Sequence, residues 1–317
     1  MLWDQHACAE LVETADLTEL RRYRAAGGGL VSLNVGYAPH GPGVTASLLR
    51  SFRAQVRAIE GLTLAETVAD VDRIADAGDT AVVFDLEDCA PLGGDLDAVG
   101  TLVENGVRTL APTYNHRNAA GGGCLDPDDP GLTTYGRDLV REMNAWGMVP
   151  DGSHGGARTT FDMCAASSRP VVFSHSNLRS VWEHPRNITD DQARAAADTG
   201  GVVGITGVGI FLGPNTPTLA AMIRHIERAV EVVGIAHVGV STDFSFDWPT
   251  FREVLATSPQ LYDDSYTAWG PVEWMPPETF LGLGGALAAR GWTQTDIAAV
   301  LGGNFRRVAA ESWEPLT

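Results

Sequence analysis

Short apolar segments alternate with helical patterns along this chain, and the alternation restricts the possible folds more than any other feature of the sequence. There are eight apolar runs, at residues 2–6, 30–37, 80–88, 108–114, 147–154, 170–176, 201–207 and 237–244. Most are near-continuous in Val, Ile, Leu, Phe or Ala, as is typical of strands covered on both faces. Strands that alternate with helices predict a parallel sheet, and eight such units predict closure into a (β/α)8 TIM barrel of the α/β class.

The helical patterns lie at residues 63–78, 133–147, 188–201 and 216–234. They carry threonine near their starts and glycine at their ends, which are common helix boundary residues. A doubly wound open sheet is the alternative fold, although no Gly-x-Gly-x-x-Gly follows the first run to support a nucleotide-binding version. No proline-rich linker divides the chain, so we expect one domain over residues 1–317.

The net charge of −18 at pH 7 excludes whole classes of partner. Few cations are available to neutralise phosphates, so we expect no nucleic acid and no anionic membrane surface as a partner. No secretory signal is visible, and no window of about 18 uninterrupted apolar residues predicts a membrane helix. The four cysteines form no Cys-x-x-Cys, so we expect reduced thiols in a cytoplasmic protein.

Polar residues gather at the ends of the apolar runs, where barrel enzymes carry their chemistry. Imidazole, carboxylate and thiol groups together are typical ligands of a first-row metal, with zinc the default. One of them, Cys8, stands two residues after His6, so both side chains point to one face of a strand. Cys8 is either a metal ligand or a small buried apolar residue. The full set is His6, Cys8, Asp85, Glu87, Asp88, Tyr114, Asn115, His116, Asp151, His154, His175 and Asp243.

Two further side chains suggest how a substrate would be handled. Asp243 ends the eighth run, where a carboxylate can move a proton between a metal-bound water and a leaving amine, or can cap the next segment. Arg186 can bind a substrate carboxylate as a bidentate fork, or can form a surface ion pair with Asp190 or Asp191. The long stretch at 245–280 is rich in tyrosine and tryptophan, which suits an apolar substrate side chain or a subunit contact.

Several segments resemble the renal or membrane dipeptidase family, peptidase family M19, whose members are amidohydrolase-like metal-dependent barrels. The resemblance runs along nearly the whole chain. It is most diagnostic at residues 169–192, which keep a histidine, an Arg-Asn pair and an acidic pair in order. The other matching segments are residues 132–154, 200–213, 237–244 and 290–308.

The resemblance implies a binuclear zinc centre. His6 and the residue at position 8 would bind the first ion, Glu87 would bridge the two ions, and His154 and His175 would bind the second. Cys8 stands where the family has aspartate, and a thiolate is a softer ligand, so one zinc ion per chain is an alternative to two.

The resemblance also assigns roles in catalysis and binding. Asp243 would transfer protons and Arg186 would hold the carboxylate of a dipeptide. The family histidine that stabilises the oxyanion aligns with Tyr114, while Asn115 and His116 follow it and could take over this role. Tyr114 and Asn115 are also candidate substrate contacts, and a homodimer is expected because family members commonly dimerise.

Three functions remain open at this point. The first is metal-dependent hydrolysis of a dipeptide or related small amide with a free carboxylate, by a metal-bound hydroxide. The second is a remodelled barrel with an altered centre, acting in a specialised biosynthetic or catabolic step. The third, a non-catalytic binding protein, is disfavoured because Glu87, His154, His175, Arg186 and Asp243 are all retained.

Overall fold

The computed structural model describes residues 1–314, whose strands pair in parallel. One sheet has the order β1-β2-β4-β5-β6, with β3 beside the start of β4, and the other consists of β7 and β8. β3 was not among the eight predicted runs. The strands are β1 (Leu2–Ala7), β2 (Gly29–Asn34), β3 (Leu62–Leu64), β4 (Thr80–Leu86), β5 (Val107–Leu110), β6 (Val149–Pro150), β7 (Val203–Thr206) and β8 (Val238–Ser241).

Single bridges join the two sheets into a ring. The predicted run at 170–176 forms no regular strand, but its bridges Asp151–Val172 and Phe173–Val203 place it between β6 and β7. On the other side, the Cys8 amide donates to the Phe244 carbonyl at 2.9 Å, next to the end of β8. These contacts close the curled sheet and confirm the TIM barrel prediction.

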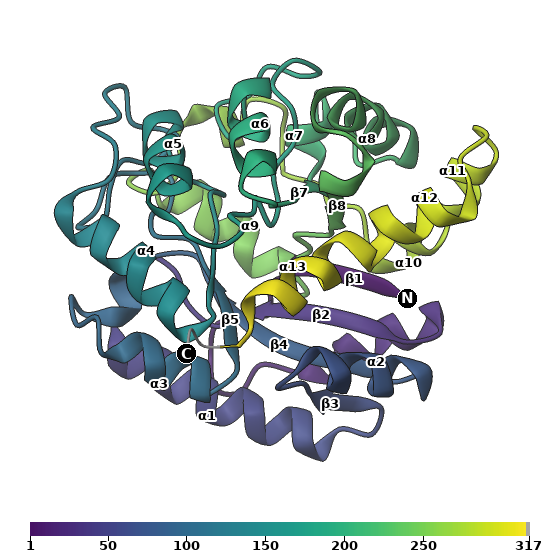
Figure 1. The fold of residues 1–317 in the computed structure, drawn as a ribbon, viewed down its shortest axis with the longest axis horizontal. Helices are drawn as coiled ribbons and strands as arrows, with labels where there is room; N and C mark the ends of the chain where they lie inside the picture. Colours follow the sequence, from purple (N-terminus) through teal and green to yellow (C-terminus); the bar gives the residue numbers. More distant parts are fainter. Residues whose placement is uncertain (315–317) are drawn as a thin grey trace.

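The helices lie mainly around the outside of the sheet (Figure 1). The four predicted helical patterns contain α2, α4, α6 and α8, but the start of the first pattern is wrong, because Thr63 and Leu64 belong to β3. Thr67 and Thr189 cap α2 and α6 through reciprocal side-chain bonds, and the position of Thr189 in the sequence indicated the second cap. The helices are α1 (Pro42–Ala58), α2 (Val68–Asp76), α3 (Ala98–Glu104), α4 (Thr134–Trp146), α5 (Ala157–Ala166), α6 (Asp190–Asp198), α7 (Gly209–Leu212), α8 (Leu219–Val233), α9 (Trp248–Thr257), α10 (Pro277–Leu281), α11 (Leu283–Ala288), α12 (Gln294–Ala298) and α13 (Asn304–Ser312).

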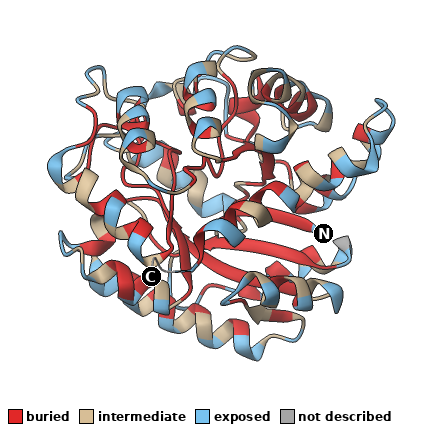
Figure 2. Ribbon diagram, viewed as in Figure 1, coloured by how far each residue is buried: buried red, intermediate tan, exposed pale blue. Residues whose placement is uncertain are grey.

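Burial follows this layered arrangement. Every residue of β1, β2 and β4 is buried, whereas the outer faces of the surrounding helices are exposed (Figure 2). Apolar burial at about 25 cal/mol per Å² is the main force that holds helices on such a sheet. Within residues 1–314, we find no helix that combines the length and the hydropathy needed to cross a membrane.

The stretch at 245–280 is more ordered than its sequence indicated. It contains α9 and the start of α10, and each of these helices has a proline in its first turn. Proline favours that position because its fixed φ suits the first turn and its missing N–H is not needed there. Side chains of α9 line a cavity together with Cys8 and Glu87, so this stretch lies over the C-terminal ends of the strands.

Candidate metal centre

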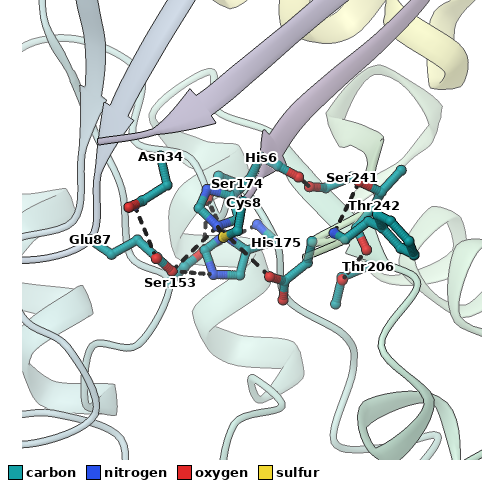
Figure 3. Close-up of polar contacts among 12 residues, drawn as sticks. His6, Cys8, Asn34, Glu87, Ser153, Ser174, His175, Thr206, Ser241 and Thr242 are labelled. Atoms are coloured by element: carbon teal, nitrogen blue, oxygen red, sulfur yellow. Dashed lines mark hydrogen bonds and ion pairs between the residues drawn. The ribbon is translucent and has the colours of Figure 1, made fainter. Parts of the chain in front are cut away.

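The five predicted metal ligands meet at the C-terminal end of the barrel. His6 and Cys8 come from the end of β1, and Glu87 directly follows β4. His154 follows β6, and His175 lies in the bridged run before β7. Figure 3 shows His6, Cys8, Glu87 and His175 facing one another at this point. Parallel strands of a barrel bring residues together in this way although they are far apart in the sequence.

One oxygen of Glu87 is the point on which the three imidazoles converge. Glu87 Oε1 lies 2.9 Å from His154 Nε2 and 3.4 Å from both His6 Nε2 and His175 Nε2. Cys8 Sγ lies 3.4 Å from His6 Nε2. The ligand atoms form three overlapping groups that could each hold an ion, two of which share Glu87. The groups are His6–Cys8–Glu87, Glu87–His154–His175 and His6–His175–Asp243. A shared carboxylate between two such groups is the arrangement that a bridging ligand requires.

Hydrogen bonds outside the centre set the orientation of the first and third imidazoles. His6 Nδ1 lies 3.0 Å from Asp85 Oδ1. His175 Nδ1 lies 2.7 Å from Ser174 Oγ, and the Ser174 hydroxyl donates to Asp151. In both cases the outer partner is left to accept, so Nδ1 carries a proton. Nε2 of His175 then presents a lone pair to the centre. Nε2 of His6 would do so once a cation replaces the second proton, which the neighbouring carboxylates favour in the metal-free protein.

His154 has two neighbours at its outer nitrogen. Nδ1 lies 2.8 Å from Asn115 Oδ1 and 3.1 Å from Arg186 Nε. An amide oxygen only accepts, and this contact is the shorter one, so it favours a proton on Nδ1. His154 therefore also directs the lone pair of Nε2 towards Glu87.

The side chains fit a bound cation. His154 Nε2 and His175 Nε2 lie only 3.0 Å apart. Burial lowers the pKa of both histidines well below the ordinary value, so neither ring is charged. With the single proton of each ring on Nδ1, as the outer contacts favour, no proton links the two Nε2 atoms. Two lone pairs at this distance repel each other unless a cation lies beside both. Burial likewise raises the pKa of Glu87 to about 8, which a cation at Oε1 would reverse.

Asp243 lies at the edge of the same group. Its Oδ1 is 3.7 Å from His6 Nε2, and the residue has a left-handed backbone with φ of 50°. The preceding residue, Thr242, is held by Asp4 of β1, which accepts bonds from both the Thr242 amide at 2.7 Å and its hydroxyl at 2.6 Å. This contact fixes the turn that carries Asp243. Burial raises the pKa of Asp243 to about 6, although the neighbouring His6 opposes the shift.

Arg186 is buried next to the centre. Its guanidinium donates to Ser176 Oγ at 3.3 Å and to the His175 carbonyl at 3.2 Å. The alternative of a surface ion pair is wrong, because Arg186 is only 2% exposed. The two acids considered for that pair bind other arginines, with Asp190 accepting from Arg228 and Asp191 from Arg194.

Tyr114, Asn115 and His116 point in three different directions. Tyr114 lines the cavity, stacks on the His154 ring at 4.1 Å and shares a hydroxyl bond of 2.9 Å with Tyr262. Asn115 is fully buried and does not line that cavity; it holds His154 instead. His116 turns outward to within 3.5 Å of Asp126, so the prediction of an oxyanion role for His116 is not supported. The positive φ of Asn115 makes the tight turn that separates these side chains.

Several supporting residues were not singled out from the sequence. Asp4, Asn34 and Ser174 were absent from the candidate set, yet Asn34 donates to Glu87 at 3.0 Å. Their one sequence signal was a polar side chain within an apolar run. Asp88 was a candidate, but it accepts bonds from the Tyr114 amide and Asn118, and belongs to none of the potential metal groups among the described residues.

The chain is similar in sequence to several known proteins. Residues 14–254 match the family model of the membrane dipeptidases, peptidase family M19. A Klebsiella pneumoniae protein described as an uncharacterized protein in the pqqA 5′ region is 31% identical over 265 residues, which cover 80% of this chain and 90% of that protein. Dipeptidase verJ of Clonostachys rogersoniana is 33% identical over 185 residues, which cover 58% of this chain and 48%, about half, of that protein.

The fold has close counterparts among solved structures. The crystal structure of an amidohydrolase from Pseudomonas aeruginosa superimposes with a TM-score of 0.89 and 26% identity, covering 99% of this chain and 96% of that one. The family match spans most of the chain and includes three of the five converging ligands, Glu87, His154 and His175. It also includes Asp243. The chain therefore belongs to the membrane dipeptidase family, peptidase family M19.

Proposed function

We propose that this chain hydrolyses a dipeptide, or a related small amide with a free carboxylate, using zinc ions bound by His6, Cys8, Glu87, His154 and His175. The observation that carries the proposal is the convergence of three imidazole Nε2 atoms on Glu87 Oε1 within 3.4 Å. Ions bound there would polarise the scissile carbonyl and make a bound water acidic. Membership in a peptidase family supports hydrolysis of a peptide bond as the reaction.

Asp243 is suited to move the proton in this reaction. It lines the cavity beside Glu87, and burial raises its pKa to about 6, near the pH at which a carboxylate can both accept and return a proton. The bond from the Asp243 amide to the His6 carbonyl, at 2.9 Å, keeps the carboxylate next to the centre. In the proposed role, Asp243 accepts a proton from water and donates it to the leaving amine.

Arg186 is suited to bind the substrate carboxylate. No carboxylate of residues 1–314 lies within ion-pair distance of its guanidinium, which donates to the neutral Ser176 hydroxyl and His175 carbonyl. A buried cation is costly unless it is paired, and a substrate carboxylate would supply the missing partner. Tyr114 lies on the cavity side of His154, where its ring or hydroxyl would contact the same substrate.

A second candidate function rests on Cys8. Its thiol belongs to only one of the two groups that meet at Glu87, so the two ion positions differ in chemistry. Burial raises the pKa of this thiol to about 12, and Cys8 would ionise only next to a cation. This asymmetry favours a remodelled centre with one tightly held ion as the alternative.

The test is hydrolysis of a dipeptide panel, including D-residues at the C-terminal position, with zinc added and with a chelator. We expect the protein to hydrolyse at least one dipeptide, and we expect the chelator to abolish this activity. If the protein hydrolysed no dipeptide with any metal ion tested, the proposal would be rejected. Elemental analysis separates the two candidates, because two zinc equivalents per chain support the binuclear centre and one supports the remodelled centre. For Arg186→Lys, kcat/KM should fall about 10–100-fold on dipeptides but little on their C-terminal amides, because a bidentate bond to the carboxylate is lost.

A further inference from the structure

The metal centre opens into a cavity of about 260 Å³ that has a mainly apolar wall away from the ligands. One side presents Cys8, Asn34, Glu87, His154 and Asp243. The opposite side is built by the α7 segment, by α9 and by the residues after α9. Its main side chains are Ile210, Phe211, Phe251, Val254, Leu255 and Trp274.

This apolar wall is held together by the backbone as well as by side chains. The Gly209 amide donates to the Glu273 carbonyl at 2.8 Å, and the Met275 amide donates to the Gly207 carbonyl at 3.0 Å. The rings of Phe251 and Trp274 pack with their centroids 5.9 Å apart. Two segments that are about sixty residues apart in the sequence are thus joined into one surface, and the apolar pocket exists before a substrate arrives.

The charges around the cavity restrict what it can accept. The acidic side chains in its lining are Glu10, Glu87, Asp243 and Asp247. No arginine or lysine lines it in the part of the chain that the structure describes. An acidic group placed on the apolar wall would lose its hydration, find no cation there, and face the carboxylates of the rim.

The tyrosine and tryptophan side chains of the 245–280 stretch do not all face the cavity, and Tyr262 is buried without lining it. Tyr266 and Trp274 line the cavity, whereas Trp248 and Trp269 are 41% and 49% exposed. Of these four residues, only Tyr266 and Trp274 are therefore placed to contact an apolar side chain of the substrate. A cavity of about 150 Å³ already holds benzene, so 260 Å³ accommodates an aromatic ring with part of a peptide backbone.

We propose that this wall is a specificity subsite for a large, uncharged apolar side chain, aromatic or branched aliphatic, next to the amide that is cleaved. This proposal rests on the proposed hydrolysis, and it specifies the class of substrate that the same metal centre would cleave. Substrates with small or acidic side chains at that position are disfavoured, the small ones because they leave the wall in contact with water, and the acidic ones because of charge.

The first test compares kcat/KM on the zinc-loaded protein for dipeptides with Phe, Leu, Gly or Asp at each of the two positions, with Ala at the other. At one position, Phe and Leu should exceed Gly and Asp by at least about tenfold, the effect of burying one large apolar side chain. Equal rates for all four at both positions would overturn the subsite while leaving the hydrolase intact.

A charge placed in the wall provides the second test. Val254 of α9 lines the cavity, whereas the adjacent Glu253 is exposed and does not. In Val254→Arg, the preference for Phe over Asp should fall at least about tenfold, because a new cation pairs with the acidic side chain. The matched control Glu253→Arg changes the charge on the same helix and should keep the wild-type preference. An unchanged preference in Val254→Arg, or an equal loss in the control, would contradict the proposal.

A binding measurement separates the subsite from the reaction. Calorimetry would compare non-hydrolysable phosphinate isosteres of Phe-Ala, Ala-Phe and Ala-Ala. Suppose that the protein cleaves no dipeptide but binds one of the two Phe isosteres at least about tenfold more tightly than the Ala-Ala isostere. The proposed subsite would then be supported, and the proposed hydrolysis would be refuted. Equal affinity for all three isosteres would refute the subsite.

Discussion

Replacing Ser174 with alanine tests whether the histidine orientations are set from outside the metal centre. The Ser174 hydroxyl lies between Asp151, to which it donates, and His175 Nδ1 at 2.7 Å. All three residues are at most 3% exposed, so water cannot readily replace the lost contacts. Ser174→Ala leaves the His175 N–H without its acceptor and removes a donor from Asp151.

The expected effects follow from these two contacts. The free energy of unfolding of the metal-free protein should fall by about 3 kcal/mol, because one bond to a carboxyl group is lost and one buried donor is left unpaired. Zinc affinity should fall about 10–100-fold, since the ring of His175 is no longer fixed with Nε2 towards Glu87. Chemical denaturation measures the first effect, and competition with a chromophoric chelator measures the second.

Ser312→Ala is a matched control. Ser312 is fully buried in α13, and its hydroxyl has no hydrogen-bond partner among the described residues. Its removal should change neither stability nor zinc affinity appreciably. If Ser174→Ala bound zinc with wild-type affinity, the argument that outer hydrogen bonds orient the imidazoles would be refuted.

Three other predictions concern the centre itself. Asp243→Asn should lower kcat about 10²–10⁴-fold, the usual contribution of a general acid–base group, while zinc content stays unchanged by elemental analysis. The cobalt-substituted protein should show a near-ultraviolet thiolate-to-cobalt absorption band, and Cys8→Ser should abolish it if Cys8 is a ligand. The unfolding free energy of the metal-free protein should fall as pH rises from about 7 to 8. The fall should reach up to about 1.4 kcal/mol per pH unit for each group that keeps its proton in the folded chain and loses it in the unfolded chain. Those groups are Glu87, whose pKa burial raises from 4.5 to about 8, and His6, whose pKa its neighbouring carboxylates raise against the effect of burial.

The sign of the pH effect depends on which groups bind a different number of protons in the folded and unfolded chains. Burial lowers the pKa of the two other histidines of the centre, and of His184 and His225, so the unfolded chain binds more protons at these rings near pH 6.5 and they oppose the fall there. Above about pH 7 these rings are mostly neutral in both states, and their contribution becomes small. The remaining two groups hold protons in the folded chain that the unfolded chain has released, which makes stability fall with pH. Bound zinc should keep Glu87 ionised and remove most of this fall, and stability that rose with pH in the metal-free protein would contradict the assigned shifts.

Much of the centre could be predicted from the chain because the relevant signals are local. His6 and Cys8 are two residues apart on a strand, and Glu87 and Asp243 directly follow strands, so a parallel barrel brings them to the same end. The family resemblance then indicated which of these residues would bind the first ion, bridge the two ions, or bind the second ion. The ligand roles and the homodimer stay predictions.

Other parts of the site depended on contacts that the sequence does not encode locally. A tight turn at Asn115 with φ of 57° directs His116 to the surface, although Tyr114 beside it lines the cavity. Arg186 looked equally compatible with a surface ion pair until its burial against His175 was known.

The sequence by itself determined the alternation of strands and helices and the residue types at the strand ends, because hydrophobic periodicity and capping act over a few neighbouring residues. Only the tertiary structure decided which nitrogen of each imidazole faces the centre, which partner holds it there, and which aromatic side chains form the cavity wall. Those properties arise from hydrogen bonds and packing between residues far apart in the chain, such as Asp85 with His6 or Trp274 with Phe251, and they exist only once the barrel has closed.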